Sequence, residues 1–299
     1  IDYGYFSKPP LLSWIIASFS FFFGNSFEAL KIIPFVFYFF TTYIIYLLSY
    51  ELYSDKHFSI VVSLSFYLLP AVSVSSFLLS TDVILIFFWS LSLLILIKIQ
   101  KKPIFLNFLL LGIFLGLSFL AKYAAVYFLI SLLFYIFFDE KIRKVFLDNV
   151  FNSLFFLFTT ILIILPNIFW NLNNQWVTFD HTSDNIGFER IGFNFLQGLE
   201  FLLTQAVMMG PILFFSFVFL IKKNKFVFQT KFLLFFSLPV FFIVFIESIL
   251  VRANANWAAV AIVPLFIFAI NIVYNYSKKL ILLNSFLNFF FCILFFLLI

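Results

Sequence analysis

Long apolar runs separated by short polar breaks are the feature of this sequence that most restricts its fold. A helix that crosses a bilayer needs about 20 mainly apolar residues, with a range of about 17–25. Ten runs reach that length or come close to it: 28–50, 57–79, 82–98, 104–120, 122–138, 145–166, 198–221, 229–250, 255–274 and 280–299. Only 10% of the residues are charged, whereas a water-soluble domain has about 25%. Lipid is therefore the expected solvent.

The length of these runs also predicts the class of structure. In hydrocarbon every backbone polar group must bond internally, which admits only helices or closed barrels, and the runs are too long for strands. We expect one all-α, polytopic transmembrane domain over residues 1–299, with about ten spans. The stretch 11–23 is too short to cross and should form an interfacial helix. Pro70 should kink or split the 57–79 run.

The basic residues indicate how the domain is oriented. If the chain starts outside the cytoplasm and crosses ten times, 13 of the 18 Lys and Arg residues lie in or beside cytoplasmic connections. Cytoplasmic loops of membrane proteins carry such an excess. Residues 167–197 are then predicted to form an extracytoplasmic loop. The remaining five basic residues are Lys8, Lys31, Lys122, Arg190 and Arg252.

The net charge of +5 does not indicate a nucleic-acid partner, because the basic residues form short clusters between apolar runs. Cys292 is the only cysteine, so no disulfide can form within these residues. The sequence begins Ile-Asp-Tyr-Gly, without Met or a signal peptide. We expect that its natural start lies upstream.

Three ionisable residues at the predicted outer boundary are candidates for a site, each with a simpler explanation. Lys8 precedes Pro9 and can meet a lipid phosphate as a point charge, or it can only snorkel at a helix end. Asp82 opens the 82–98 run, where it can hold a metal ion or an acceptor, or only complement the helix dipole. Lys122 interrupts an apolar stretch and needs a partner or water, unless it is an ordinary turn lysine.

The predicted outer loop is rich in polar and aromatic residues. Trp170 and Trp176 can anchor the chain at the interface or stack on sugars, and Asn171 lies beside the first of them. Asp180 and His181 can bind a metal, although one His with one acid is a weak pattern. Arg252 can grip a phosphate in bidentate fashion, or pair only with Glu247. Lys8, Asp82 and His181 are expected to converge on one outward-facing cavity.

Five short motifs occur in the order found in a known superfamily. They are Tyr5-Phe6-Ser7-Lys8-Pro9-Pro10-Leu11-Leu12-Ser13-Trp14, Ser80-Thr81-Asp82 with Phe87-Phe88-Trp89, Ala121-Lys122-Tyr123, Trp170-Asn171 with Trp176-Val177-Thr178-Phe179-Asp180-His181-Thr182, and Asn256-Trp257. Together they resemble GT-C glycosyltransferases, in the bacterial branch related to dolichyl-phosphate-mannose–protein mannosyltransferases and lipid A aminoarabinose transferases. The resemblance covers nearly all of the sequence.

The resemblance implies transfer of a sugar from a polyprenyl-phosphate donor to an extracytoplasmic lipid, glycan or protein, in a bacterial inner membrane. Lys8, Lys122 and Arg252 would contact the donor phosphate, and Asp82 would be the second acidic residue of the site. The substrate would contact Tyr5, Trp170, Asn171, Trp176, Asn256 and Trp257. A divalent metal is a candidate cofactor at His181 and Asp180, although Ser7 stands where related enzymes have an acid. The leading acid, the expected general base, would precede Ile1, so these residues alone are expected to be inactive.

Two other classes of membrane protein are alternatives. A transporter or lipid flippase places ionisable groups and broken helices near the midplane, usually with internal repeats. Here the acids lie at the outer boundary and no repeat is visible. A non-enzymatic polytopic scaffold would not need acidic and basic groups together on one face.

Overall fold

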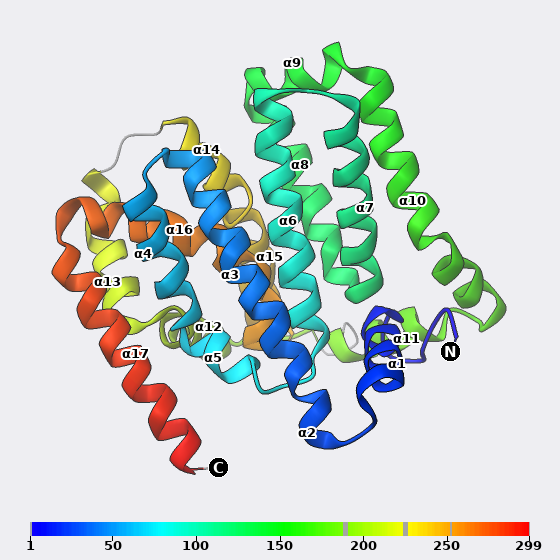
Figure 1. Cartoon of the computed structure of the whole chain (residues 1–299), viewed down its shortest axis with the longest axis horizontal. Coiled ribbons are helices and arrows are strands. Elements are labelled where there is room, and N and C mark those ends of the chain that lie inside the picture. Colours follow the sequence, from blue (N-terminus) through cyan, green and yellow to red (C-terminus); the bar gives the residue numbers. More distant parts are fainter. Residues whose placement is uncertain (1, 188–190, 224–226, 252, 299) are drawn as a thin grey trace.

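The computed structural model describes residues 2–187, 191–223, 227–251 and 253–298. It is helical, and the helices that run between the two ends of the molecule are seen side by side in Figure 1. The first half contains α1 (Leu11–Phe23), α2 (Phe27–Leu30), α3 (Ile32–Tyr53), α4 (Lys56–Tyr67), α5 (Pro70–Ser75), α6 (Thr81–Lys101), α7 (Phe105–Ala121), η1 (Tyr123–Ala125) and α8 (Val126–Phe138).

The second half continues this helical arrangement. It contains α9 (Glu140–Asp148), α10 (Val150–Asn173), α11 (Val177–Ile186), α12 (Phe195–Met209), α13 (Pro211–Leu220), η3 (Ile221–Lys223), α14 (Phe228–Phe235), α15 (Leu238–Leu250), η4 (Ala255–Ala258), α16 (Ala259–Tyr276) and α17 (Lys278–Leu298). The all-α membrane fold predicted from the apolar runs is confirmed.

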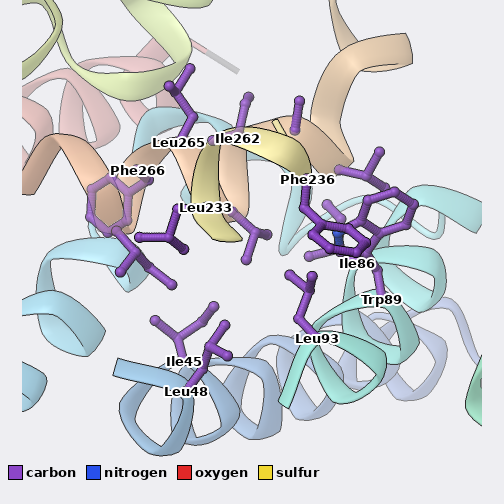
Figure 2. Close-up of a cluster of buried hydrophobic side chains, with 14 of the residues drawn as sticks. Ile45, Leu48, Ile86, Trp89, Leu93, Leu233, Phe236, Ile262, Leu265 and Phe266 are labelled. Atoms are coloured by element: carbon purple, nitrogen blue, oxygen red, sulfur yellow. The ribbon is translucent and has the colours of Figure 1, made fainter. Parts of the chain in front are cut away.

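Two helices form the centre of the bundle. In the apolar segments Thr81–Lys101 (α6) and Ala255–Tyr276 (η4 and α16), 78% and 83% of the most apolar 18 residues are buried inside the protein. The corresponding value is 22% in both α10 and α17. Figure 2 shows Ile45 of α3, Trp89 of α6 and Phe266 of α16 in one buried cluster. The outer helices expose many Phe and Leu side chains, as a surface facing lipid requires.

Six of the ten predicted spans correspond to segments long and apolar enough to cross a membrane. Within the described residues these are Phe27–Tyr53, Thr81–Lys101, Val150–Asn173, Phe228–Leu250, Ala255–Tyr276 and Lys278–Phe295. The helical segments at 104–120 and 122–138, Phe105–Ala121 and Tyr123–Phe138, are shorter than these six. Lys122 is extended, and it ends α7 after 17 residues. The predicted helix over 11–23 coincides with α1.

Two predicted spans are interrupted. The 57–79 run breaks between α4 and α5, where Leu69 is extended and Pro70 starts the new helix. This confirms the expected effect of Pro70, since proline disfavours helical backbone in the residue before it. The 198–221 run bends by 108° between α12 and α13. Gly210 at the bend has φ of 90°, and Pro211 starts α13.

Two polar connections are more ordered than the sequence suggested. Asp139 Oδ1 accepts the backbone N–H groups of Lys141 and Ile142, which starts α9 in the short polar break between the predicted spans 122–138 and 145–166. Residues 167–197, expected as one loop, contain the end of α10, all of α11 and the start of α12. Figure 1 places α9 at one end of the bundle and α1, α2, α5, α11 and α12 at the other, called here the α11 end.

Candidate active site at the α11 end

A cavity of about 540 Å³ opens among segments that are distant in sequence. The first residues of α6, the turn between α7 and α8, one residue of α15 and the stretch before α16 all contribute to it. Its lining residues are Ser7, Lys8, Pro9, Ser80, Thr81, Asp82, Lys122, Tyr123, Ala124, Val126, Tyr127, Thr182, Asn185, Glu247, Asn254, Asn256 and Trp257. Its volume suits a small polar ligand, since such sites measure about 300–1,000 Å³.

Asp82 is the centre of the hydrogen bonds in this cavity. Its Oδ1 accepts from Lys122 Nζ at 2.6 Å, and its Oδ2 accepts from Asn256 Nδ2 at 2.8 Å. Both members of the ion pair are largely buried, with 12% of the Asp82 side chain and 24% of the Lys122 side chain exposed. The carboxylate thus joins α6, the α7–η1 turn and η4, which are up to 174 positions apart.

Local sequence explains why Asp82 and Lys122 reach this point. Ser80 is extended and its Oγ accepts the N–H of Asp82, which starts α6 with the acid in the first turn. An acid there is also stabilised by the helix dipole. Lys122 is extended after α7, and its N–H still bonds to Ser118 O. Because charges inside hydrocarbon are costly, the two residues pair at the helix ends rather than within a span.

Residues 2–8, called here the strap, lie against α10 and α11. Asn167 Nδ2 donates to Tyr3 O at 2.8 Å, and Thr178 Oγ1 donates to Tyr5 O at 2.9 Å. Between these bonds, a Cβ on Gly4 would lie 2.0 Å from the Trp170 ring. Only glycine therefore lets the strap approach so closely.

A largely buried network of polar side chains from the α7–α8 turn and α10 lies next to the strap. Tyr123 Oη donates to Asn167 Oδ1 at 2.8 Å and accepts from Asn171 Nδ2 at 3.2 Å. The Tyr123 ring stacks on Phe179, with centroids 4.9 Å apart. Residues of the motifs around Tyr123 and Trp170 thus hold the strap in place.

The strap ends at Lys8, which is exposed and lines the cavity. The remaining basic residue of the lining, Lys122, is bound to Asp82. Within the described parts of the chain, no carboxylate forms an ion pair with Lys8. Lys8 therefore brings to the cavity a positive charge that has no ion-pair partner among the described residues.

The structure brings together only some of the predicted site residues. Lys8, Asp82, Lys122, Asn256 and Trp257 line the cavity. Tyr5, Trp170, Asn171 and Trp176 are not among its lining residues; they lie in the strap, at the end of α10 and before α11. Arg252 lies outside the described residues.

The predicted metal ligands are beside the cavity rather than in its lining. His181 packs edge-on against the Phe6 ring, with centroids 5.4 Å apart, and Asp180 is exposed. Successive residues of an α-helix point about 100° apart, so these two side chains leave α11 in different directions, and metal binding by them stays a prediction. Among the residues described, no three His, Cys, Asp or Glu side chains group as a metal site would require.

Glu247 lines the cavity, although the sequence predicted it only as a partner for Arg252. It is the sole acid of the apolar run 229–250. An ionisable group in a membrane span is costly and usually functional, and that signal was available in the sequence. Tyr127, Thr182, Asn185 and Asn254 also line the cavity and carried no such signal.

Comparisons with known proteins agree with this fold. A family model described as dolichyl-phosphate-mannose-protein mannosyltransferase matches residues 7–170. The lipid A galacturonosyltransferase RgtD of Rhizobium johnstonii is 28% identical over 283 residues, covering 92% of this chain and 58% of that protein. The chain thus spans little more than half the length of this curated relative.

Two solved structures share the arrangement of helices. ArnT from Cupriavidus metallidurans bound to undecaprenyl phosphate has a TM-score of 0.64 and 13% identity, over 92% of this chain and 51% of that one. The apo oligosaccharyltransferase of Archaeoglobus fulgidus has a TM-score of 0.54 and 14% identity, over 97% and 46%. At these identities the likeness concerns the fold.

Proposed function

This chain belongs to the dolichyl-phosphate-mannose–protein mannosyltransferase family, within the GT-C glycosyltransferases, and from that premise we propose how its cavity is used. The protein transfers a sugar from a polyprenyl-phosphate donor to an acceptor outside the cytoplasm. The donor phosphate binds beside Lys8, and the sugar occupies the cavity in front of Asp82, Asn256 and Trp257. The name of the curated relative, a lipid A galacturonosyltransferase, supports lipid A as a candidate acceptor.

The observation that supports this proposal most is the contrast between the two lysines of the cavity. Asp82 holds Lys122 at 2.6 Å, whereas Lys8 has no ion-pair partner among the described residues. A phosphate that leaves the water needs a cation nearby, and hydrogen bonds to charged groups contribute about 1.5–3 kcal/mol. Lys8 provides that cation, and Lys122 and Arg252 are proposed to add to it.

The proposed reaction is a displacement at the sugar's anomeric carbon. The acceptor oxygen forms the new bond, the bond to the phosphate oxygen breaks, and polyprenyl phosphate leaves with the electron pair. Lys8 stabilises the charge that develops on this leaving group. A carboxylate takes the acceptor's proton, and the resemblance assigns that role to an acid that precedes the strap in sequence.

Asp82 has a different part in this proposal. Both of its oxygens accept hydrogen bonds from protein donors, so the carboxylate directs Lys122 and Asn256 toward the cavity. Its predicted role as the second acidic residue stays a prediction, as does sugar contact by Tyr5, Trp170, Asn171 and Trp176. No step is assigned to a metal, because Asp180 and His181 diverge along α11.

The protein is a multi-pass membrane protein, and we place its cavity on the extracytoplasmic side of a bacterial inner membrane. The cavity lies at the α11 end, and α9 with its basic residues lies at the other. This separation agrees with the distribution of Lys and Arg, which puts the basic connections in the cytoplasm.

Substitution of Lys8 tests the proposal in the full-length protein. Lys8→Ala should reduce transfer from a polyprenyl-phosphate sugar to isolated envelope lipids about tenfold to a hundredfold, since about 1.4 kcal/mol is a factor of ten. Lys8→Arg should restore part of the activity, because it keeps the charge but changes the geometry. Wild-type turnover by Lys8→Ala would exclude this role for Lys8.

Lys31→Ala is the matched control. Lys31 is also predicted to be on the outer side, but its Nζ lies over the Phe27 ring at 4.2 Å and it does not line the cavity. Its removal should leave transfer unchanged. An equal loss with both variants would indicate a general effect of surface charge.

A further inference from the structure

Three residues of the cavity lining come from one short connection between helices. Asn254, Asn256 and Trp257 lie between α15 and α16, in residues 253–258, called here the cavity loop. Asn254 and Asn256 are exposed and Trp257 is half-buried, so the packing of these side chains contributes little to fixing the loop. Its position therefore depends on the bonds that its backbone makes to neighbouring helices.

Gln205 of α12 makes such a bond. Its Nε2 donates to Ala255 O at 3.0 Å, across 50 positions of sequence. In the described parts of the chain, no other side chain forms a hydrogen bond to the backbone of the cavity loop. Gln205 is 3% exposed, and it is the buried one among the polar residues of α12. Because an amide buried without a hydrogen bond is costly, this side chain is held firmly to Ala255 O.

The helix that carries Gln205 is itself fixed against α15. Phe201 of α12 packs against Phe241 of α15, with ring centroids 5.6 Å apart. Just before α12, the N–H groups of Gly192 and Asn194 donate at 2.8 Å to the carbonyl oxygens of the last two residues of α15. The end of α15 and the cavity loop that follows it are thus both bonded to the segment 192–205.

The bond from Gln205 reaches the cavity through the next residue of the loop. Ala255 precedes Asn256, whose Nδ2 donates to Asp82 Oδ2 at 2.8 Å. The other oxygen of Asp82 accepts from Lys122. A shift of the cavity loop would therefore break one of the two bonds that distant side chains make to Asp82. Gln205 is not among the lining residues, so it acts through the loop and not by touching a ligand.

We propose that Gln205 is a positioning residue for the transfer reaction, which holds the cavity loop so that Asn256 stays bonded to Asp82. The inference rests on the proposed function, and it adds a residue outside the cavity to those that transfer requires. Positioning of this kind affects rates because a displacement of about 1 Å, even from a change far from the chemistry, can lower a rate about a hundredfold.

Transfer by the full-length protein tests this, with isolated envelope lipids as acceptors. The donors are undecaprenyl phosphate bearing a hexose or a hexuronic acid, and the variants are assayed with the donor that the wild type uses. Gln205→Met removes the hydrogen-bond donor at similar side-chain length, and it should lower the transfer rate about threefold to tenfold. In an Asn256→Ala background, which already lacks the bond to Asp82, Gln205→Met should change the rate less than about twofold.

Gln229→Met is the matched control. Gln229 Nε2 also donates to a backbone oxygen of another helix, Leu52 O at 3.1 Å, but it lies in α14, away from the α11 end. Both variants should lose similar thermal stability, whereas only Gln205→Met should lose transfer. If Gln205→Met does not fold, Gln205→Ala and Gln229→Ala give the same comparison.

Three results would overturn the role of Gln205 while leaving the proposed function intact. They are unchanged transfer by Gln205→Met, an equal loss of transfer by Gln229→Met, and an equal factor of loss with and without Asn256→Ala. The last of these would mean that Gln205 does not act through Asn256. Absence of transfer by the wild type with either donor would overturn both the role of Gln205 and the proposed function.

Discussion

Asp82 is the side chain on which the arrangement of the cavity depends most. It bonds to Lys122, Asn256 and its own helix cap, Ser80. Removing one member of a largely buried ion pair leaves the other charge without a partner, so the loss exceeds what the pair itself contributed. The pair should therefore behave as one unit when it is mutated.

A double-mutant cycle measures this coupling. Asp82→Asn and Lys122→Met should each lower the stability of the purified protein by about 1.5–3 kcal/mol, the range for hydrogen bonds to charged groups. The double variant should lose less than the two single losses together, with a coupling of about 0.5–3 kcal/mol. Thermal unfolding in detergent measures these changes in stability. If the losses of the two single variants simply added in the double variant, Asp82 and Lys122 would not be energetically coupled.

The strap depends on single hydrogen bonds to main-chain oxygens. Thr178→Val removes the donor to Tyr5 O at nearly constant volume. A typical hydrogen bond contributes about 0.5–1.5 kcal/mol, so undecaprenyl phosphate should bind roughly threefold to tenfold more weakly as Lys8 loses its position. Titration of the purified variant with undecaprenyl phosphate gives this number.

Thr204→Val is the matched control for the strap, because the Thr204 hydroxyl bonds within α12 to Glu200 O, away from the cavity. It should bind undecaprenyl phosphate as the wild type does. Equal weakening by both variants would mean that Thr178 acts on general stability rather than on the strap.

Some of these residues could be selected from the sequence, whereas their contacts could not. Lys8, Asp82 and Lys122 are conspicuous because charges are rare in this chain. Apolar runs do not reveal which helices face one another, so the bond between Asp82 and Lys122 was not predictable. Tyr5 and Trp170 were assigned to sugar by resemblance, yet Tyr5 O and the Trp170 ring belong to the strap's packing.

Among the helices, α12 and α13 differ most from expectation, because one apolar run contains both. The hydropathy of a run shows how long it is, but not whether the helix bends within it. Here the bend occurs at Gly210 and Pro211. Gly210 adopts a φ of 90°, and a Cβ there would lie 2.6 Å from the Asn284 side chain of α17. Asn284 Oδ1 in turn accepts the N–H of Leu213, at the free start of α13.

Two glycine variants separate strain from crowding at this bend. Gly24 also has a positive φ, 84°, but nothing lies within 4 Å of the position of its Cβ. Gly24→Ala should cost only the backbone strain, about 1–3 kcal/mol. Gly210→Ala should cost more, because Asn284 must also move. Thermal unfolding of both variants tests this, and equal losses would show that Asn284 gives way freely.

The molecule as a unit has two chemically different ends. Three ion pairs, Glu51–Lys101, Asp139–Lys231 and Glu140–Lys144, lie toward α9, and the Asp82–Lys122 pair lies at the cavity. The distribution of basic residues assigned the α9 end to the cytoplasm. This orientation could be predicted from the sequence, because the charge of each connection can be counted locally. Contacts between side chains that are distant in sequence cannot be predicted in this way.

Cysteine labelling in intact cells tests this orientation. In a Cys292→Ser background, Asn174→Cys should react with a membrane-impermeant maleimide added outside, and Lys141→Cys only after permeabilisation. Both positions are exposed in the structure. Reaction of both cysteines from the same side would contradict the topology and the outward position of the cavity.

The hydrogen bond between Thr178 and Tyr5 has a consequence for the timing of biosynthesis. Its two residues are separated by 173 positions. Since ribosomes add about 5–20 residues per second, the strap's acceptor is made roughly 9–35 seconds before its donor. During that interval the hydrogen bond that fixes the strap, and with it the position of Lys8, cannot form. The strap can therefore take its final place only after α11 has been synthesised, and the cavity is complete only after Trp257, the last residue of its lining, has been added.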